Sequence, residues 1–228
     1  MKIRYLGHSC FEIITGGKTL LVDPYISDNS LASDIDVNAL HPDFLLITHG
    51  HGDHVQDAGK VAKRNKAMVI SNFEIVTWFG KKGIEGHGMN HGGKKVFDFG
   101  TLKYVNAIHS STLPDDSPGG NPGGFVLWND EACLYIAGDT ALTQDMRLIP
   151  MTCPKLTAAI LPIGDNFTMG YEEAVIAAGF IQCDRIIACH FDTFEPIRID
   201  HDAAKKAFRD EHKELIIMKI GASLTVQR

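Results

Sequence analysis

Short apolar runs separated by Gly, Pro and Asp dominate the first quarter of the chain. They predict strands at residues 2–6, 10–14 and 19–22, with a turn at Gly16 and Gly17 between the last two. Because the connections between these runs are only a few residues long, consecutive strands should pair with each other. We therefore expect an antiparallel meander at the start of the fold.

Beyond residue 40 the apolar pattern alternates between strand and helix periodicity. It predicts strands at residues 43–48, 67–70, 95–98, 102–107, 124–128, 132–137, 158–162 and 185–189, helices at residues 54–65, 73–81, 171–181 and 201–210, and a closing strand pair at residues 215–219 and 223–227. Strands followed by helices, twice over, favour two αβ halves stacked sheet on sheet with the helices outside. With 228 residues, we expect one domain spanning residues 1–228.

Composition and charge narrow the range of partners. The net charge is −6 with His neutral, and the Lys pairs at residues 81–82, 94–95 and 205–206 are scattered, which argues against nucleic acid as a partner. No apolar run approaches the length of about 18 residues that a membrane span needs. A small-molecule substrate is therefore the expected partner, and the sequence leaves a homo-oligomer open.

Five cysteines are odd in number and form no CxxC pair, and most of them lie in apolar runs such as Ala132 to Ile136. This arrangement is typical of buried free thiols in a reducing compartment. The N-terminus also lacks the apolar segment of a signal peptide. We therefore expect a cytoplasmic protein.

Potential metal ligands are densest in the run Thr48 to His54. Within the six positions 49–54, four are potential ligands: His49, His51, Asp53 and His54. The run follows a predicted strand and precedes a predicted helix, so it should form a strand-to-helix turn. One alternative is that these residues only begin the helix, because Asp is a good N-cap residue. A cap explains one of the four side chains, whereas a metal site explains them all.

Three further candidate ligands lie within two residues of the ends of predicted strands. They are His109 after residues 102–107, Asp139 after residues 132–137, and His190 after residues 185–189. Residues just beyond the carboxyl ends of strands tend to meet at one rim of a sheet. Five histidines and two aspartates could therefore assemble into one site.

The complete pattern, His49-x-His51-x-Asp53-His54 followed in order by His109, Asp139 and His190, resembles the metallo-β-lactamase superfamily over the whole chain. Further runs resemble a branch of small metal-dependent hydrolases similar to L-ascorbate 6-phosphate lactonase. These runs are residues 6–11, 22–24, 162–170 and 190–194.

The resemblance implies an α+β fold, a four-layer αββα sandwich with two mixed sheets face to face, and two divalent metal ions at its rim. It places one ion on His49, His51 and His109, the other on Asp53, His54 and His190, with Asp139 between them. Zinc is the first expectation, and Mn, Ni and Fe are alternatives. The implied activity is hydrolysis of a small ester, lactone or phosphoester by a metal-bridging hydroxide, with Asp139 orienting the water and Asp53 receiving its proton.

Several residues keep two interpretations at this point. His8 is either a turn residue or a catalytic contact near the metals, and Asp23 either forms a turn or accepts a hydrogen bond from a ligand histidine. His87 and His91, among four glycines, are expected in a mobile loop that could touch substrate. The loop at residues 118–124 is favoured as a plain hairpin connection, with a flexible lid as the alternative.

Two other functions compete with hydrolysis. One is a non-catalytic, metal-dependent module that binds or senses a metabolite. The other is a di-iron redox protein, which is disfavoured because similar redox proteins carry glutamate in place of His51 and have a flavin domain.

Overall fold

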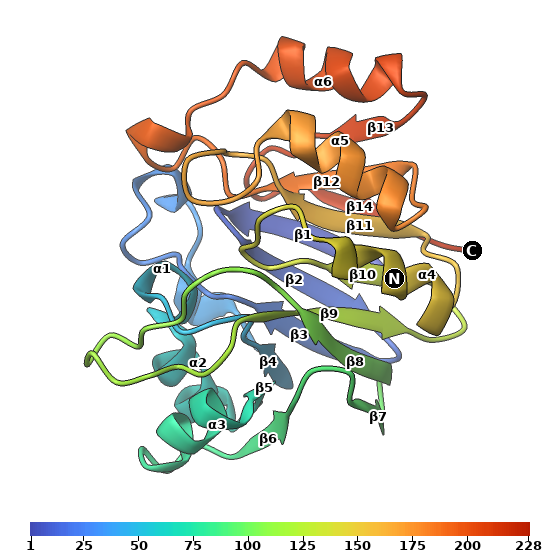
Figure 1. Ribbon diagram of the computed structural model, residues 1–228. Helices are drawn as coiled ribbons and strands as arrows, with labels where there is room; N and C mark the ends of the chain where they lie inside the picture. Colours follow the sequence, from blue (N-terminus) through green and yellow to red (C-terminus); the bar gives the residue numbers. More distant parts are fainter.

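Two seven-stranded mixed sheets pack face to face in the computed structural model, which describes residues 1–228 (Figure 1). In the first sheet the strand order is β14 (Ser223–Thr225), β1 (Lys2–Gly7), β2 (Cys10–Thr15), β3 (Lys18–Val22), β4 (Phe44–Leu46), β5 (Met68–Asn72) and β6 (Gly86–Met89). In the second it is β13 (Glu214–Ile216), β12 (Arg185–Cys189), β11 (Ala158–Pro162), β10 (Cys133–Ile136), β9 (Gly123–Trp128), β8 (Gly100–Asn106) and β7 (Lys94–Phe97). The antiparallel meander of β1, β2 and β3 is confirmed.

Helices cover the outer face of each sheet, which confirms the α+β, four-layer αββα sandwich. The first sheet carries α1 (Gly52–Val55), α2 (Ala58–Asn65) and α3 (Phe73–Gly80), with η1 (Ser30–Ala32) and η2 (Val37–Ala39) nearby. The second carries η3 (Gln144–Leu148), α4 (Ile149–Thr152), α5 (Tyr171–Phe180) and α6 (His201–Asp210), and η4 (Glu195–Ile197) precedes α6. No helix combines the length and apolar character that crossing a bilayer requires.

Three apolar clusters hold these layers together. One lies between the sheets and includes Phe11, Leu127 and Ile160, and one lies beneath the helices of each sheet. Both faces of the inner strands are therefore buried, as β11 illustrates, since all five of its residues are buried. This double burial explains why these strands are continuous apolar runs and do not alternate with polar residues.

The single helix predicted at residues 54–65 is wrong, because the structure breaks it between α1 and α2. Asp57 lies at the break and caps neither helix with its side chain. Its carboxylate instead accepts hydrogen bonds from the backbone N–H groups of Ile26, at 2.8 Å, and Ser27, at 2.9 Å. Asp57 therefore links the segment after β3 to the start of α2.

The expectation of a mobile loop around His87 is also wrong. Residues Gly86–Met89 form β6, which pairs in parallel with β5 at the edge of the first sheet. A Cβ atom on Gly86 would lie 2.7 Å from Val76 Cγ1 on α3, so α3 can pack on this strand only over a glycine. Glycines that resemble loop signals in the sequence thus serve close packing between helix and strand.

The predicted closing strand pair does not form, although both strands exist. β13 pairs in parallel with β12 in the second sheet, and β14 pairs with β1 in the first. The chain crosses between the sheets after β13, and the two termini come together where Val226 N–H donates to Met1 C=O at 2.9 Å. The helical segment of η3 and α4 was not predicted, because its apolar residues span too few turns to show a period.

Candidate metal centre

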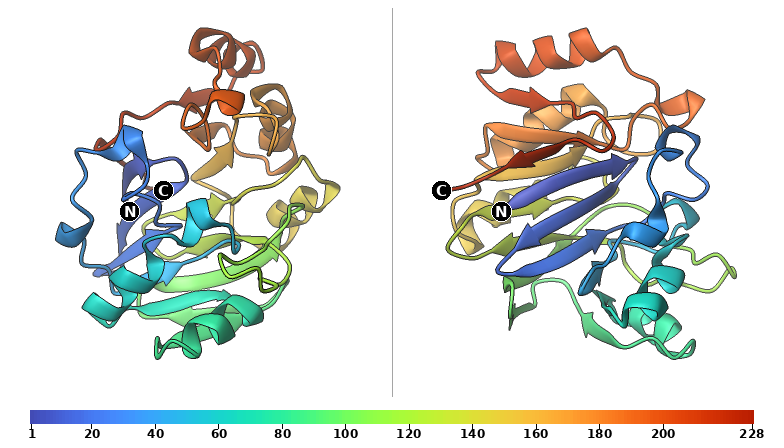
Figure 2. Two further views of the ribbon diagram at one scale, coloured as in Figure 1. Left: turned by 90° about the vertical axis from the view of Figure 1, so that its left-hand side faces the viewer. Right: turned by 180° about the vertical axis from the view of Figure 1, so that it is seen from behind.

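All seven predicted ligands lie together at one rim of the sandwich, the edge that faces the viewer in the left panel of Figure 2. His49, His51, Asp53 and His54 occupy the turn from β4 into α1, while His109, Asp139 and His190 follow β8, β10 and β12. Asp139 Oδ2 is the centre of the group. It lies 2.9, 3.4, 3.6 and 4.0 Å from Nε2 of His190, His54, His109 and His49 respectively.

Close approach of two strand ends brings Asp139 to the histidine cluster. Gly138, directly before Asp139, has a φ of 66°. A Cβ atom there would lie 2.7 Å from Cβ of Thr48, the residue directly before His49. Only glycine accommodates both the left-handed backbone and this contact between the two sheets.

Asp23 orients two of the histidines. Its Oδ2 accepts hydrogen bonds from His54 Nδ1, at 2.9 Å, and from Thr48 Oγ1, at 2.7 Å. Because the Thr48 hydroxyl donates to Asp23, it accepts from His49 Nδ1 at 3.0 Å. Both Nδ1 atoms therefore carry hydrogens, which leaves Nε2 of each ring as the available ligand atom. The structure thus favours the second interpretation of Asp23, as an acceptor for a ligand histidine.

Buried polar atoms without partners mark the same point. His54 Nε2 and Asp139 Oδ1 are buried and make no hydrogen bond, although unsatisfied buried groups are uncommon in folded proteins. His49 Nε2 and His51 Nδ1 face each other at 3.0 Å, and His51 Nε2 bonds the hydroxyl of Ser110 at 3.1 Å. A donor set of imidazoles and carboxylates converging in this way fits a divalent metal ion.

His8 lies beside the cluster and contacts one of its carboxylates. Its Nε2 is 3.1 Å from Asp53 Oδ2, and its Nδ1 is 3.0 Å from Thr193 Oγ1. Burial lowers the pKa of His8 to about 4, so the ring is neutral at pH 7. With one ring hydrogen, it donates to Asp53 and accepts from Thr193. Asp53 lies within α1 and does not cap it, since His51 is the N-cap residue, so the capping alternative for Asp53 is wrong.

Three residues around the centre have left-handed backbones at strand ends. These are His8 after β1, Asp23 after β3 and His190 after β12, with φ of 54°, 40° and 53°. Each non-glycine residue in this region costs roughly 1–2 kcal/mol, and such residues cluster at functional sites. Here the left-handed backbone ends each strand and turns the side chain toward the centre.

The pKa values of most histidines of the cluster and of Asp139 are lowered, which favours neutral rings and a charged carboxylate. Burial lowers the pKa of His49, His51 and His109. Burial alone would raise the pKa of Asp139, but the neighbouring rings of His190 and His54 outweigh it and hold that pKa well below its usual range. Asp139 is therefore ionised at neutral pH, which is the form that binds a metal.

His54 behaves in the opposite way from the other rings. Burial alone would lower its pKa, but the carboxylates of Asp139 and Asp23 outweigh this effect and raise the pKa well above its usual value. The two carboxylates thus attract a positive charge to Nε2 of His54. A metal ion bound there would take the place of a proton.

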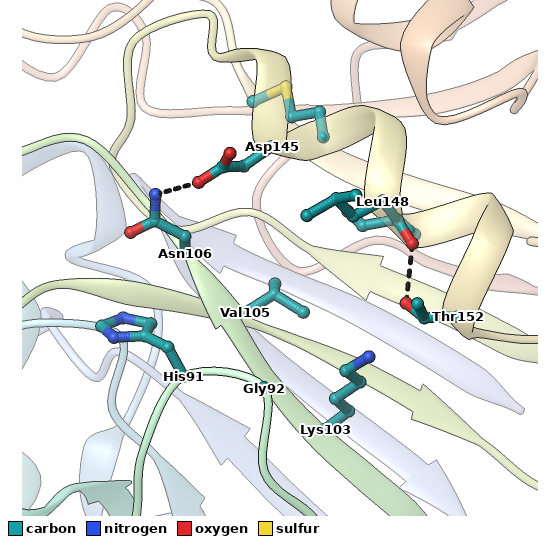
Figure 3. A pocket seen from close by; sticks show the side chains of 10 residues that line it. His91, Gly92, Lys103, Val105, Asn106, Asp145, Leu148 and Thr152 are labelled. Atoms are coloured by element: carbon teal, nitrogen blue, oxygen red, sulfur yellow. Dashed lines mark hydrogen bonds between the residues drawn. The ribbon is translucent and has the colours of Figure 1, made fainter.

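His91 lies in a different cavity of about 290 Å³, between β8 and the η3–α4 segment (Figure 3). Its Nε2 is 2.9 Å from Pro122 O, and its ring stacks on Tyr104 with centroids 4.9 Å apart. His87, in β6, packs edge-on against Phe97 of β7, with centroids 5.5 Å apart. Neither ring lines the cavity at the candidate metal centre.

The loop at residues 113–124 is bonded to its surroundings along its length. Asn72 Nδ2 donates to Gly119 O at 2.7 Å, and Trp78 Nε1 donates to Asp115 Oδ2 at 2.6 Å. Tyr104 OH donates to Asn121 O at 3.4 Å. These bonds support the interpretation of a fixed connection over that of a flexible lid.

Sequence reasoning missed the residues that complete the cavity around the centre. This cavity has a volume of about 430 Å³ and is lined by His51, Asp53, His109, Ser110, Asp139, Phe167, His190, Phe194 and Pro196. Phe167 and Phe194 lie in the runs at residues 162–170 and 190–194, but nothing in those runs indicated that their rings face the site. The hydroxyl of Ser110 was also missed, although it follows His109 directly.

Comparison with known proteins places this geometry in a family. Residues 2–190 match the model of the beta-lactamase superfamily domain. The chain is 53% identical to a metal-dependent hydrolase of Flavobacterium johnsoniae over 98% of this chain and 99% of that protein.

The chain is also similar to solved structures of hydrolases. A metallo hydrolase of the archaeon Ignicoccus hospitalis is 31% identical, with a TM-score of 0.90 over 100% of this chain and 98% of that one. An isothiocyanate hydrolase from Delia radicum gut bacteria, 19% identical, has a TM-score of 0.82 over the full length of both chains and shares the fold.

Proposed function

The chain belongs to the metallo-β-lactamase superfamily and, within it, to a family of metal-dependent hydrolases, and we propose that it hydrolyses a small ester, lactone or phosphoester with two divalent metal ions. The observation that carries the proposal is the position of Asp139 Oδ2 within 4.0 Å of four imidazole nitrogens. Two buried atoms of the same group, His54 Nε2 and Asp139 Oδ1, have no other partner.

We assign the ligands in two sets that share one carboxylate. His49, His51 and His109 would hold one ion, which agrees with the grouping of one nitrogen from each ring within 4.8 Å. Asp53, His54 and His190 would hold the other, with Asp139 between the two. The nitrogen-rich donor set favours zinc, and manganese, nickel and iron are compatible with the two carboxylates.

Bound divalent ions would polarise the scissile carbonyl or phosphoryl oxygen and lower the pKa of a coordinated water to about 7. The residues of the chain orient and protect this chemistry. Asp139 is 2% exposed and ionised, so it can orient a water molecule by accepting its hydrogen bond. Asp53 is more accessible, with a side chain 26% exposed, and it can receive a proton and pass it to solvent.

His8 acts as a positioning residue in this proposal. The N–H of its neutral ring holds the carboxylate of Asp53 at 3.1 Å, while Thr193 fixes the other side of the ring. Loss of the ring should leave Asp53 free to rotate away from the centre.

We also propose the domain organisation of the enzyme, its compartment and the size of its substrate. Ligands come from both sheets, which supports one catalytic domain over residues 1–228. Four of the five free cysteines are buried, which supports a reducing compartment such as the cytoplasm. The cavity volume of about 430 Å³ suits a small-molecule substrate.

The test combines metal content with turnover. Elemental analysis of protein loaded with zinc or manganese should give two ions per chain, and hydrolysis of p-nitrophenyl acetate, δ-valerolactone and bis-p-nitrophenyl phosphate would be measured in parallel. Asp139→Asn should abolish turnover, whereas His87→Ala serves as a control outside the centre. Undiminished turnover in Asp139→Asn, or one ion per chain at saturation, would overturn the proposal.

A further inference from the structure

The cavity at the candidate metal centre is lined by side chains of two kinds. The polar ones are His51, Asp53, His109, Ser110, Asp139 and His190, and the apolar ones are Phe167, Phe194 and Pro196. We infer that the substrate is an uncharged carboxylic ester or lactone that carries an apolar group, and that Phe167 and Phe194 select this group. The inference rests on the proposed function and narrows its substrate class.

Phe194 forms a wall that is in place before substrate binds. Its ring lies edge-on to His8 with centroids 5.4 Å apart, and 6.3 Å from the ring of Tyr25. The segment that carries it is tied back by Asp192, which accepts hydrogen bonds from Ile199 N–H at 3.1 Å and from His201 Nε2 at 2.6 Å. A preorganised apolar wall favours binding because little conformational entropy is lost.

Phe167 lies at the tip of a tight turn and is 52% exposed. Asp165 and Asn166 before it have φ of 61° and 55°, and Gly164 pairs with Gly170 at the base of the turn. Met169 N–H donates to Thr140 O at 3.0 Å, which anchors the turn next to Asp139. An apolar ring held exposed at the mouth of a site gains from contact with an apolar ligand, because both surfaces leave water.

The charge of the lining favours this substrate over a phosphoester. The nine lining residues include two carboxylates and no Lys or Arg. Sites that act on phosphoryl groups hold the non-bridging oxygens with Arg, Lys or divalent ions, so a phosphoester here would depend on the bound ions alone. The net charge of the chain, −6, also disfavours the approach of an anion. An ester has no anionic oxygens that need to be neutralised.

The reaction balances with water as the only co-reactant. The water oxygen forms a bond to the carbonyl carbon, and the bond from that carbon to the alkoxy oxygen breaks. The alkoxy oxygen keeps the electron pair and takes up a proton, while the second proton of the water is released from the new carboxylic acid. An ester thus gives an alcohol and a carboxylate, and a lactone gives a hydroxy acid.

The first experiment compares acyl chain length in the metal-loaded enzyme. Because each methylene in an apolar pocket changes kcat/KM severalfold, p-nitrophenyl hexanoate should exceed p-nitrophenyl acetate by about tenfold or more. Phe167→Ala and Phe194→Ala should reduce the hexanoate value more than the acetate value, mainly through KM. Phe73→Ala, which removes the ring of a residue that is 64% exposed on α3, is the matched control and should leave the ratio unchanged. Faster turnover of p-nitrophenyl phosphate than of hexanoate, or a ratio that neither variant changes, overturns the inference.

A binding experiment separates this inference from the proposed function. N-methylhexanamide, an uncharged amide, should raise the melting temperature of the protein as purified, and inorganic phosphate should raise it less. Phe167→Ala, at an exposed position that tolerates truncation, should reduce the shift. Amide binding that depends on Phe167 without any ester turnover supports the apolar site and counts against the hydrolase. Ester turnover without amide binding or chain-length preference counts against the apolar site alone.

Discussion

Two groups of histidines in this chain look alike in sequence and differ in the structure. His49, His51 and His54 form one group, and His87 and His91 form the other, both interrupted by glycines. In the first group ring nitrogens face each other, or lie buried without a partner. In the second, His91 Nε2 is already paired with the backbone carbonyl oxygen of Pro122. Unsatisfied ring nitrogens, more than histidine density, therefore distinguish a candidate metal centre.

The largest expected difference between the groups is in activity. His54→Ala removes the buried Nε2 atom that has no protein partner, and it should lower kcat/KM for an ester by at least about a hundredfold, since even indirect neighbours of a metal cost 10–100-fold. His91→Ala should retain activity within about twofold, because its ring lies outside the cavity of the centre. Similar losses in the two variants, measured by steady-state kinetics, would abolish the distinction.

The next largest effect is expected in metal affinity. Asp23→Ala removes the acceptor that fixes His54 directly and His49 through Thr48, so the metal Kd should rise by about 10–100-fold. Asp145→Ala, which removes a carboxylate bonded to Asn106 in the second cavity, is the control and should leave Kd unchanged. Competition with a chelating dye measures both values, and excess metal should restore much of the activity of Asp23→Ala.

Acidification should destabilise the metal-free protein. Burial lowers the folded-state pKa of His8, His49, His51 and His109, whereas the unfolded-state value is about 6.5. Below pH 6.5 the unfolded chain therefore binds more protons than the folded one, and stability falls.

His54 has a raised pKa and acts in the opposite sense, because its stabilising contribution is fully present below pH 6.5 and is lost as pH rises through the folded value. The four rings should outweigh it. Urea unfolding of chelator-treated protein at pH 7.5 and 5.5 tests this sign, and equal or greater stability at pH 5.5 would contradict it.

The smallest effect concerns the second histidine group itself. His91→Ala should lower the free energy of unfolding by about 1 kcal/mol, the usual net contribution of one hydrogen bond, here the bond to Pro122 O. Urea titration of metal-loaded His91→Ala and wild-type protein would measure it. A much larger loss would mean that the 113–124 loop depends on this bond alone and not on the bonds from Asn72 and Tyr104 as well.

Most strands and the longer helices could be predicted from apolar periodicity, and the structure confirms helix α6 at the predicted residues, 201–210. Errors arose where a neighbour decided the local structure. β6 exists because α3 packs over Gly86, and β13 and β14 separate because the chain passes from one sheet to the other. Such neighbours are distant in the chain and cannot be predicted from the local sequence.

The candidate site, too, could be predicted only in part from the sequence. The order and spacing of the seven candidate ligands could be read from the sequence, because four of them share one strand-to-helix turn and the others lie within two residues of the ends of predicted strands. The roles of Asp23 and His8 could not, because their partners Thr48, His54, Asp53 and Thr193 lie 25 to 185 residues away.

The sequence by itself determined the kind of chemistry, since imidazole and carboxylate groups bind metals wherever they converge. Tertiary structure alone decided which of them converge. Gly138 approaches Thr48 closely enough to bring Asp139 from one sheet to His49 on the other, while the backbone carbonyl of Pro122 occupies the ring nitrogen of His91. The physical reason is that a ligand atom must be both close to its fellows and free of other partners, and only the packed chain sets these two conditions.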